Sequence, residues 1–165
     1  LEFIDLATKM PDIQFVWAGN FAFKGISEGR KEIMEHMDDL PDNVHFLGLV
    51  ERDRMNEFFN MGDVMLQLSF EELFPMTILE SMNANIPLLL RDLPEYKPIL
   101  FDYYLKANSQ QTFKDELTKL KEDADYYAKA CEGSKRGEQF YSKESILEQW
   151  QQFYDKVATE RNLLS

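Results

Sequence analysis

Short apolar segments alternate with longer amphipathic ones through most of the chain, and this alternation constrains the fold more than any other feature. The apolar segments are rich in residues that favour β-strands, and they span residues 13–18, 44–47, 63–68 and 86–91, with a further extended piece at 103–105. Strands that are apolar on both faces are typical of a parallel sheet covered by helices on two sides. The sequence therefore predicts a doubly wound α/β domain.

Helical periodicity fills the intervals between these strands and continues after them. Apolar residues recur every three or four positions, which predicts helices over residues 1–10, 28–38 (with Ser27 as the cap), 51–61, 74–84 and 95–101, followed by three helices over 110–121, 122–139 and 143–160. The last helix has an apolar stripe that we interpret as a packing face, made of Trp150, Phe153, Tyr154 and Val157. We therefore divide the chain into an α/β domain over 1–108 and a helical C-terminal segment over 109–165 that packs on it.

Composition excludes several classes of partner. The 165 residues carry a net charge of −12, which argues against nucleic acid, because neutralising phosphates requires Lys and Arg. One cysteine, Cys131, excludes an internal disulfide, and His36 and His45 have no metal-ligand spacing, so no metal site is expected. No run of about 18 apolar residues occurs, and Leu1 opens into a helix without a basic leader. We expect a cytoplasmic protein, and the chain reads as if it starts partway through a larger one.

Ligands of open parallel sheets bind beyond the carboxyl ends of the strands. Four loops follow the predicted strands at that edge: Gly19-Asn20, 48–50, 69–75 and 91–95. The loop over 69–75 leads into a helix, whose free N–H groups and dipole favour a phosphate. Pro75 suits the first helical turn, and Met76 and Thr77 would offer backbone donors there.

Two acids accompany this loop and helix. Glu72 and Glu80 lie eight residues apart, which corresponds to about 12 Å along a helix. A retaining glycosidase needs its two carboxylates about 5 Å apart, so this spacing does not fit one. It suits two acids that hold hydroxyl groups at opposite ends of an elongated ligand. Gly48 would let the backbone approach a flat base, whose edge Leu49 and Val50 could contact through their main chain.

Other common sites are absent from the sequence. There is no GxGxxG fingerprint, no P-loop and no convincing Ser-His-Asp or Cys-His set. The residues alone therefore predict a site for a ligand that carries an anionic group and hydroxyls.

These residues also resemble a known family. Glu72 and Glu80 have the E-x7-E spacing of the family 4 retaining glycosyltransferases, whose GT-B fold has two Rossmann-like domains. Four more segments occur in the family's order and distances: NVHFLGLV (43–50), DVMLQLSFEELFP (63–75), ILESMNANIPLLLRD (78–92) and the acid of PEY (94–96). The opening FIDLATKMPDIQFVWAG is also similar to members that glycosylate membrane diacylglycerol lipids.

The resemblance implies a C-terminal, nucleotide-sugar-binding domain with a Rossmann-like sheet. It assigns Glu80 to the ribose, Glu72 to catalysis and the hydroxyls of the donor sugar, and residues 75–77 to the diphosphate. Residues 48–50 would lie near the base. The remaining candidate contacts at the same edge are Gly19, Arg91 and Glu95.

The resemblance also implies partners. The donor would be a nucleotide-sugar, with UDP the nucleotide that the family suggests, and many members need no metal or other cofactor. The acceptor, a membrane glycolipid or a polysaccharide precursor, would bind a separate N-terminal domain. Membrane contact at the inner face would run only through that missing part.

The sequence departs from the family pattern in three places. Pro75 stands where Gly is common, which removes one N–H from the diphosphate site, and Asn85 stands where Gly usually follows the helix. The family's first strand, which carries a basic Arg–Lys pair, has no counterpart; Lys24 and Arg91 are poor replacements by sequence order. The sheet would then lack its middle strand, so that the helix over 1–10 packs across a gap or another chain fills it.

Two other classes of function remain open at this stage. The chain could be a noncatalytic module that binds nucleotides or sugar phosphates, or an interaction domain that uses the aromatic face of its last helix. A transferase assay with the missing parts restored separates the first from an enzyme, and titration with UDP separates the second.

Overall fold

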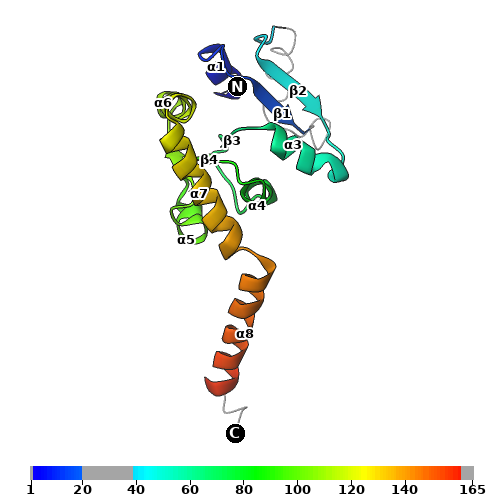
Figure 1. Ribbon diagram of the computed structural model, residues 1–165, viewed down its shortest axis with the longest axis vertical. Helices are drawn as coiled ribbons and strands as arrows, with labels where there is room; N and C mark the ends of the chain where they lie inside the picture. Colours follow the sequence, from blue (N-terminus) through cyan, green and yellow to red (C-terminus); the bar gives the residue numbers. More distant parts are fainter. Residues whose placement is uncertain (1, 20–38, 161–165) are drawn as a thin grey trace.

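The computed structural model describes residues 2–19 and 39–160. The expected helix over 28–38, its Ser27 cap and Lys24 lie outside these residues. The elements follow in the order α1 (Glu2–Thr8), β1 (Phe15–Ala18), β2 (Val44–Gly48), η1 (Arg52–Arg54), α3 (Met55–Met61), β3 (Met65–Gln67), α4 (Met76–Asn83), β4 (Leu88–Arg91), η2 (Pro94–Tyr96), α5 (Lys97–Leu100), β5 (Leu105–Ala107), α6 (Gln110–Glu122), α7 (Ala124–Phe140) and α8 (Lys143–Glu160) (Figure 1). Between β2 and β5 the predicted alternation of strands and helices is confirmed.

The strands form two parallel sheets. β1 pairs with β2, with Phe15 opposite Val44, and β4 lies between β3 and β5, with Leu89 opposite both Leu66 and Leu105. Every pairing is parallel, as strands that are apolar on both faces predict. Within residues 2–19 and 39–160, no hydrogen-bonded ladder joins the two sheets. The division between β1 and β3 corresponds to the gap that the family resemblance implies.

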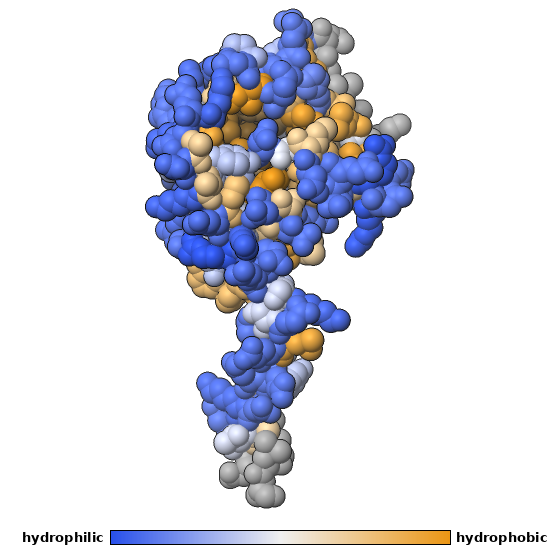
Figure 2. Space-filling model, viewed as in Figure 1, coloured by the Kyte–Doolittle hydropathy of each residue, from blue (hydrophilic) through white to orange (hydrophobic). Residues whose placement is uncertain are grey.

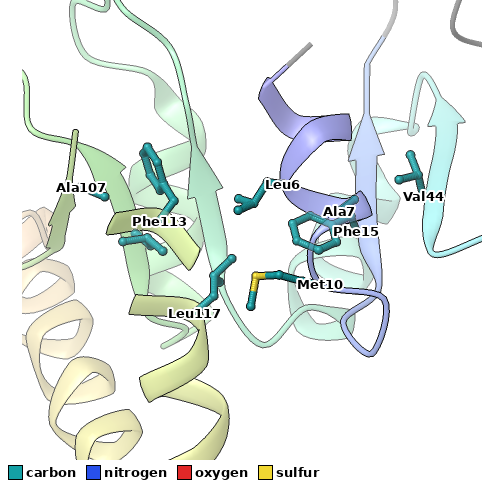
Figure 3. Packing of buried hydrophobic residues seen from close by; sticks show 9 residues of the cluster. Leu6, Ala7, Met10, Phe15, Val44, Ala107, Phe113 and Leu117 are labelled. Atoms are coloured by element: carbon teal, nitrogen blue, oxygen red, sulfur yellow. The ribbon is translucent and has the colours of Figure 1, made fainter. Parts of the chain in front are cut away.

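Helix α1 packs across this division. Leu6 and Ala7 are completely buried, and together with Met10 they belong to one core cluster that includes residues of both sheets and of α6, namely Phe15, Val44, Leu89, Ala107, Phe113 and Leu117. In Figure 3, Leu6 and Met10 extend from the α1 region toward Leu117, while Ala7 lies beside Phe15. Burial of one such large side chain contributes about 1.5–3 kcal/mol, so α1 is a main source of cohesion between the sheets.

A second cluster forms around α4, β4 and α5. Ile78 and Met82 of α4 are buried in it, and α7 covers α4 closely. The closeness depends on small residues: an added Cβ at Gly137 would lie 2.6 Å from Met82 Sδ, and Ser134 Oγ donates to Ile86 O at 2.6 Å. Packing against α7 therefore fixes the position of α4, the helix that carries Glu80.

The chain turns sharply after α4 and after α5. Asn85 has a φ of 57°, which confirms that Asn takes the left-handed conformation where the family usually has Gly. Phe101, at φ 53°, ends α5, and Tyr103 N then donates to Leu100 O at 2.9 Å in a turn. The extended piece is expected over 103–105, but the turn takes up its first residues and the strand begins only at Leu105.

The prediction that Pro75 lies in the first turn of the helix is wrong. Pro75 is the N-cap of α4 rather than part of its first turn, because its ψ of 131° is extended and the helix begins at Met76. The carbonyl of Pro75 accepts the N–H of Ile78 at 3.1 Å.

Helix α8 differs from the expectation that it packs on the domain. It projects from the end of α7 as a stalk in Figure 1 and contains no buried residue. Figure 2 shows the stalk as largely hydrophilic with an apolar patch, and Leu147, Trp150, Phe153 and Tyr154 of this helix are each more than half exposed. The aromatic stripe predicted from the sequence is present, but the described residues do not cover it.

A buried amide holds α1 and the following turn to the start of β2, which leads to a stability prediction. Asn43 Nδ2 lies 3.0 Å from Ala7 O, 3.0 Å from Met10 O and 2.8 Å from Ile13 O. Asn43→Ala removes all three contacts: Ala7 O and Met10 O keep a backbone N–H donor, whereas Ile13 O loses its donor among the described residues. We therefore expect the free energy of unfolding in urea to fall by about 2 kcal/mol.

The matched control is Asn60→Ala, which removes an exposed amide that donates to Asn56 O at 2.7 Å. Its expected effect is within about 0.5 kcal/mol. Equal losses for the two variants would contradict the role given to Asn43.

Candidate functional site

The first turn of α1 brings the carboxyl ends of the two sheets to one edge. Glu2 pairs with Arg91 at the end of β4, and the neighbouring Phe3 packs its ring 5.5 Å from Trp17 near the end of β1. Gln110 Nε2 donates to Glu2 O at 2.9 Å and holds this turn in place. These contacts bring the end of β1 and the end of β4 to the same short helix, so in the described residues the two sheets present these strand ends on one side.

The glycines of the first sheet lie together at this edge. Gly19 follows β1, and its N–H donates to Gly48 O at 2.7 Å. Gly48 has a φ of 69°, which only glycine adopts freely, and an added Cβ would have no atom of the described residues within 4 Å. This space suits a flat ligand. The next two residues, Leu49 and Val50, are 76% exposed and half-buried, respectively.

Gln67, the last residue of β3, organises the loop that carries Glu72. Its Nε2 donates to Ser69 Oγ at 2.8 Å and to Glu72 Oε1 at 2.6 Å. The amide fixes a half-buried carboxylate by a charge-assisted bond. Sequence analysis missed Gln67; the available signal was a polar side chain near the end of an apolar strand.

The start of α4 is the candidate anion site. Met76 and Thr77 are its first two residues, and the N–H groups of a helix's first turn have no partner within the helix. Met76 is 64% exposed and Thr77 is half-buried, so this end of the helix is open to a ligand. Pro75 contributes no N–H, as expected from the sequence.

The remaining acids lie further from the strand ends. Glu80 is exposed on α4, and the helical rise places it about 6 Å along the axis from Met76. Glu95 is exposed in η2, next to the buried Tyr96. The structure thus has one carboxylate in the loop, one on the helix and one beyond β4, with a positive helix end between the first two.

Arg91 is committed to the protein itself. Its Nε donates to Leu68 O at 3.0 Å, its guanidinium lies 3.4 Å from Asn108 O and pairs with Glu2, and only 8% of its side chain is exposed. The ring of Phe70 covers its face at 3.9 Å. This side chain joins α1, β3, β4 and the end of β5, a structural role that the sequence did not indicate.

Burial and charge act together on Tyr96. Burial, followed by the negative charges of Glu72 and Glu95, raises the pKa of this phenol to about 12. The hydroxyl therefore stays protonated, as a hydrogen-bond donor, at any physiological pH.

Metal-ligating side chains do not cluster in the part of the chain that the structure describes: no three His, Cys, Asp or Glu residues there come together as a metal site would require. None of the helices in residues 2–19 and 39–160 has the length and apolar character needed to cross a membrane.

Solved structures of other proteins share this fold. HepE from Anabaena, determined in complex with UDP-glucose, matches with a TM-score of 0.75 over 96% of this chain and 44% of its own, at 17% identity. A sucrose-phosphate synthase from Thermosynechococcus elongatus matches with a TM-score of 0.77 over 96% of this chain and 42% of its own, at 16% identity. The fold is thus that of a GT-B glycosyltransferase domain.

The sequence places the chain within a family. The model of the family described as "Glycosyl transferases group 1" matches residues 2–137, so the chain belongs to that family. The α-galactosylglucosyldiacylglycerol synthase of Streptococcus pneumoniae is 36% identical over 157 residues, which are 95% of this chain and 42% of that protein. The processive diacylglycerol α-glucosyltransferase of Acholeplasma laidlawii is 28% identical over 121 residues, 72% of this chain and 36% of that protein. The chain spans less than half the length of these relatives, and the expected glycolipid branch of the family agrees with both.

The role of Arg91 gives a second stability prediction. Arg91→Met keeps much of the apolar stem but removes every donor, leaving two carbonyls and Glu2 without their partner. We expect the free energy of unfolding to fall by at least about 2 kcal/mol in a urea titration.

Arg136→Met is the control, since Arg136 makes an ion pair with Asp102 in which the side chains are 53% and 73% exposed. It should cost about 0–1 kcal/mol. A result in which Arg91→Met is as mild as Arg136→Met would show that Arg91 does not hold the elements together.

Proposed function

We propose that this chain is the donor-binding domain of a retaining glycosyltransferase that moves a sugar from a UDP-linked donor to an acceptor. The observation that carries the proposal is the continuous arrangement of Gln67, Glu72, the open start of α4 and Glu80 at the carboxyl edge of a parallel sheet. Membership of the glycosyltransferase family supports it.

The positions of these groups suit an extended ligand whose parts are each bound by a different group. The diphosphate would lie at the positive start of α4, against Met76 and Thr77 and beside Pro75. Glu80 would accept the ribose hydroxyls one helical turn further on, and Glu72, oriented by Gln67, would act on the hydroxyls of the transferred sugar.

The base would lie against the backbone of residues 48–50, where no described atom lies within 4 Å of a Cβ added at Gly48; Gly19 is a further candidate contact beside it. Glu95 is a further candidate contact, because it is exposed just beyond β4. Arg91 would act at a distance, through its charge, since its donors are taken by protein groups. The proposal includes no metal or other cofactor.

The acceptor would bind a different part of the protein. Two relatives are named for the glycosylation of diacylglycerol lipids, which supports a membrane glycolipid as the acceptor class. We place the full-length enzyme in the cytoplasm, peripheral at the inner face of the membrane, with the acceptor domain and the membrane contact in the portion that corresponds to the rest of the relatives. The helical segment over 109–165 would complete the donor domain.

Glu80 provides the direct test of donor binding. In the full-length protein, Glu80→Ala should weaken UDP binding about 10-fold in calorimetric titration, because a charged acceptor of ribose hydroxyls is lost. Glu122→Ala, which removes an exposed carboxylate at the end of α6, should leave the affinity unchanged. If the protein does not bind UDP, or if Glu80→Ala binds it as well as the wild type does, the proposed site is wrong.

Completeness of the enzyme can be tested separately. The 165-residue chain alone should show no transfer from several nucleotide-sugars, since the acceptor domain and the basic pair expected upstream are both outside it. Restoring the upstream sequence should restore transfer. Turnover by the chain alone would refute this, and binding without transfer by the full-length protein would favour the noncatalytic reading.

A second candidate function is an interaction role for α8. The observation that favours it is the exposed stripe in which Trp150 stacks on Tyr154, with ring centroids 5.7 Å apart. This role is compatible with donor binding, because α8 lies away from the ligand edge in Figure 1.

A further inference from the structure

Tyr96 carries a buried hydrogen-bond donor, its phenol hydroxyl. The residue is fully buried, and in the described part of the chain its hydroxyl has no hydrogen-bond partner. Burying a hydroxyl without a partner is costly, so such a group in a folded protein calls for an explanation.

Packing fixes the ring of Tyr96 firmly. It lies in the core cluster with Ile78, Met82 and Leu100, and the ring of Tyr104 meets it edge-on at 5.8 Å. Tyr104 provides a contrast, because its hydroxyl, from the same cluster, donates to Asp92 at 3.2 Å. The cluster can therefore satisfy a phenol, but it leaves the one in η2 unsatisfied.

Tyr96 and the loop of Glu72 meet at one core cluster, because Phe74, two residues after Glu72, packs against the buried cluster that contains Tyr96. Tyr96 lies five residues beyond the end of β4. Glu72 is the charged group that most strongly raises the pKa of Tyr96 to about 12, after burial itself, and Glu95 has a smaller influence. Glu95 is the exposed neighbour of Tyr96 in sequence, whereas Glu72 is half-buried at the proposed sugar site.

Glu72 retains capacity for another donor. Gln67 Nε2 occupies Oε1 at 2.6 Å, and within residues 2–19 and 39–160 no hydrogen bond reaches Oε2. The protein must fix the orientation of a carboxylate that accepts hydroxyls from a sugar. A carboxylate that is held by a single amide can still rotate about that one hydrogen bond.

We propose that Tyr96 is a positioning residue for Glu72, donating its hydroxyl to the carboxylate when a nucleotide-sugar occupies the site. This inference rests on the proposed function. It makes the unused hydroxyl a part of sugar recognition: the bond forms only when the sugar draws Glu72 and its loop inward. UDP alone, which has no sugar to reach Glu72, gains nothing from it.

Tyr96→Phe in the full-length protein tests the proposal, with UDP-glucose and UDP as calorimetric ligands. We expect affinity for UDP-glucose to fall about 10-fold, as for the loss of a hydrogen bond to a charged group, and affinity for UDP to change less than about 2-fold. In the Glu72→Gln background the same substitution should lose most of its effect on UDP-glucose, since the charged acceptor is gone. Tyr126→Phe, which removes a hydroxyl bonded to Glu116 on the helical segment, should change neither affinity.

The melting temperature of the unliganded variant provides a second readout. Tyr96→Phe should melt at the same temperature as the wild type or higher, because it deletes an unsatisfied group. A lower melting temperature would show a stabilising partner in the free protein and would overturn the proposal. So would an unchanged affinity for UDP-glucose, or equal losses for UDP-glucose and UDP. If the wild type binds neither ligand, it is the proposed function itself that fails.

Discussion

The guanidinium of Arg91 ties the carboxyl ends of the three-stranded sheet to α1, which no strand ladder joins to that sheet. It binds Leu68 O at the end of β3, Asn108 O after β5 and the carboxylate of Glu2 at the start of α1. Through Glu2 and Phe3, the first turn of α1 then reaches the end of β1 in the other sheet. The two sheets share one ligand edge because this short helix packs between them. An ion pair between exposed side chains would add little to the free energy of unfolding. Here the Arg91 side chain is buried and several acceptors depend on it, so its contribution is larger.

The ligand edge combines rigid support with unsatisfied groups. Close contact with α7 at Gly137 fixes α4, and Gln67 orients Glu72. The protein therefore holds in place the elements that would bind the donor. The N–H groups of Met76 and Thr77 at the start of α4 have no partner within the helix and can bind a ligand. The hydroxyl of Tyr96 is instead buried and has no partner among the described residues, and the apolar cluster around it offsets the cost of burying it.

Sequence patterns predicted this molecule well where the determining interactions are local. The period of apolar residues identified the strands and helices, and the loop 69–75 followed by a helix with Glu80 was found from spacing alone. The left-handed turn at Asn85 also followed from residue type. Family membership is confirmed by the match over residues 2–137, while the roles given to individual site residues remain predictions.

Long-range contacts account for what the sequence did not indicate. The roles of Asn43, Gln67 and Arg91 depend on partners distant in sequence or hidden by the fold, such as Ala7 O, 36 positions from Asn43, and Glu2, 89 positions from Arg91. The projection of α8 could not be predicted either, since an amphipathic stripe shows that a helix has an apolar face but not what covers it.

Backbone hydrogen exchange on the full-length protein, with and without UDP-glucose, tests whether a nucleotide-sugar binds at the carboxyl edge of the sheets. We predict that the ligand slows exchange at two separate segments, the start of α4 at Met76 to Ile78 and the turn at Gly48 to Val50, and leaves α8 unaffected. Protection at neither segment under saturating UDP-glucose would contradict the assignment of this edge as the donor site.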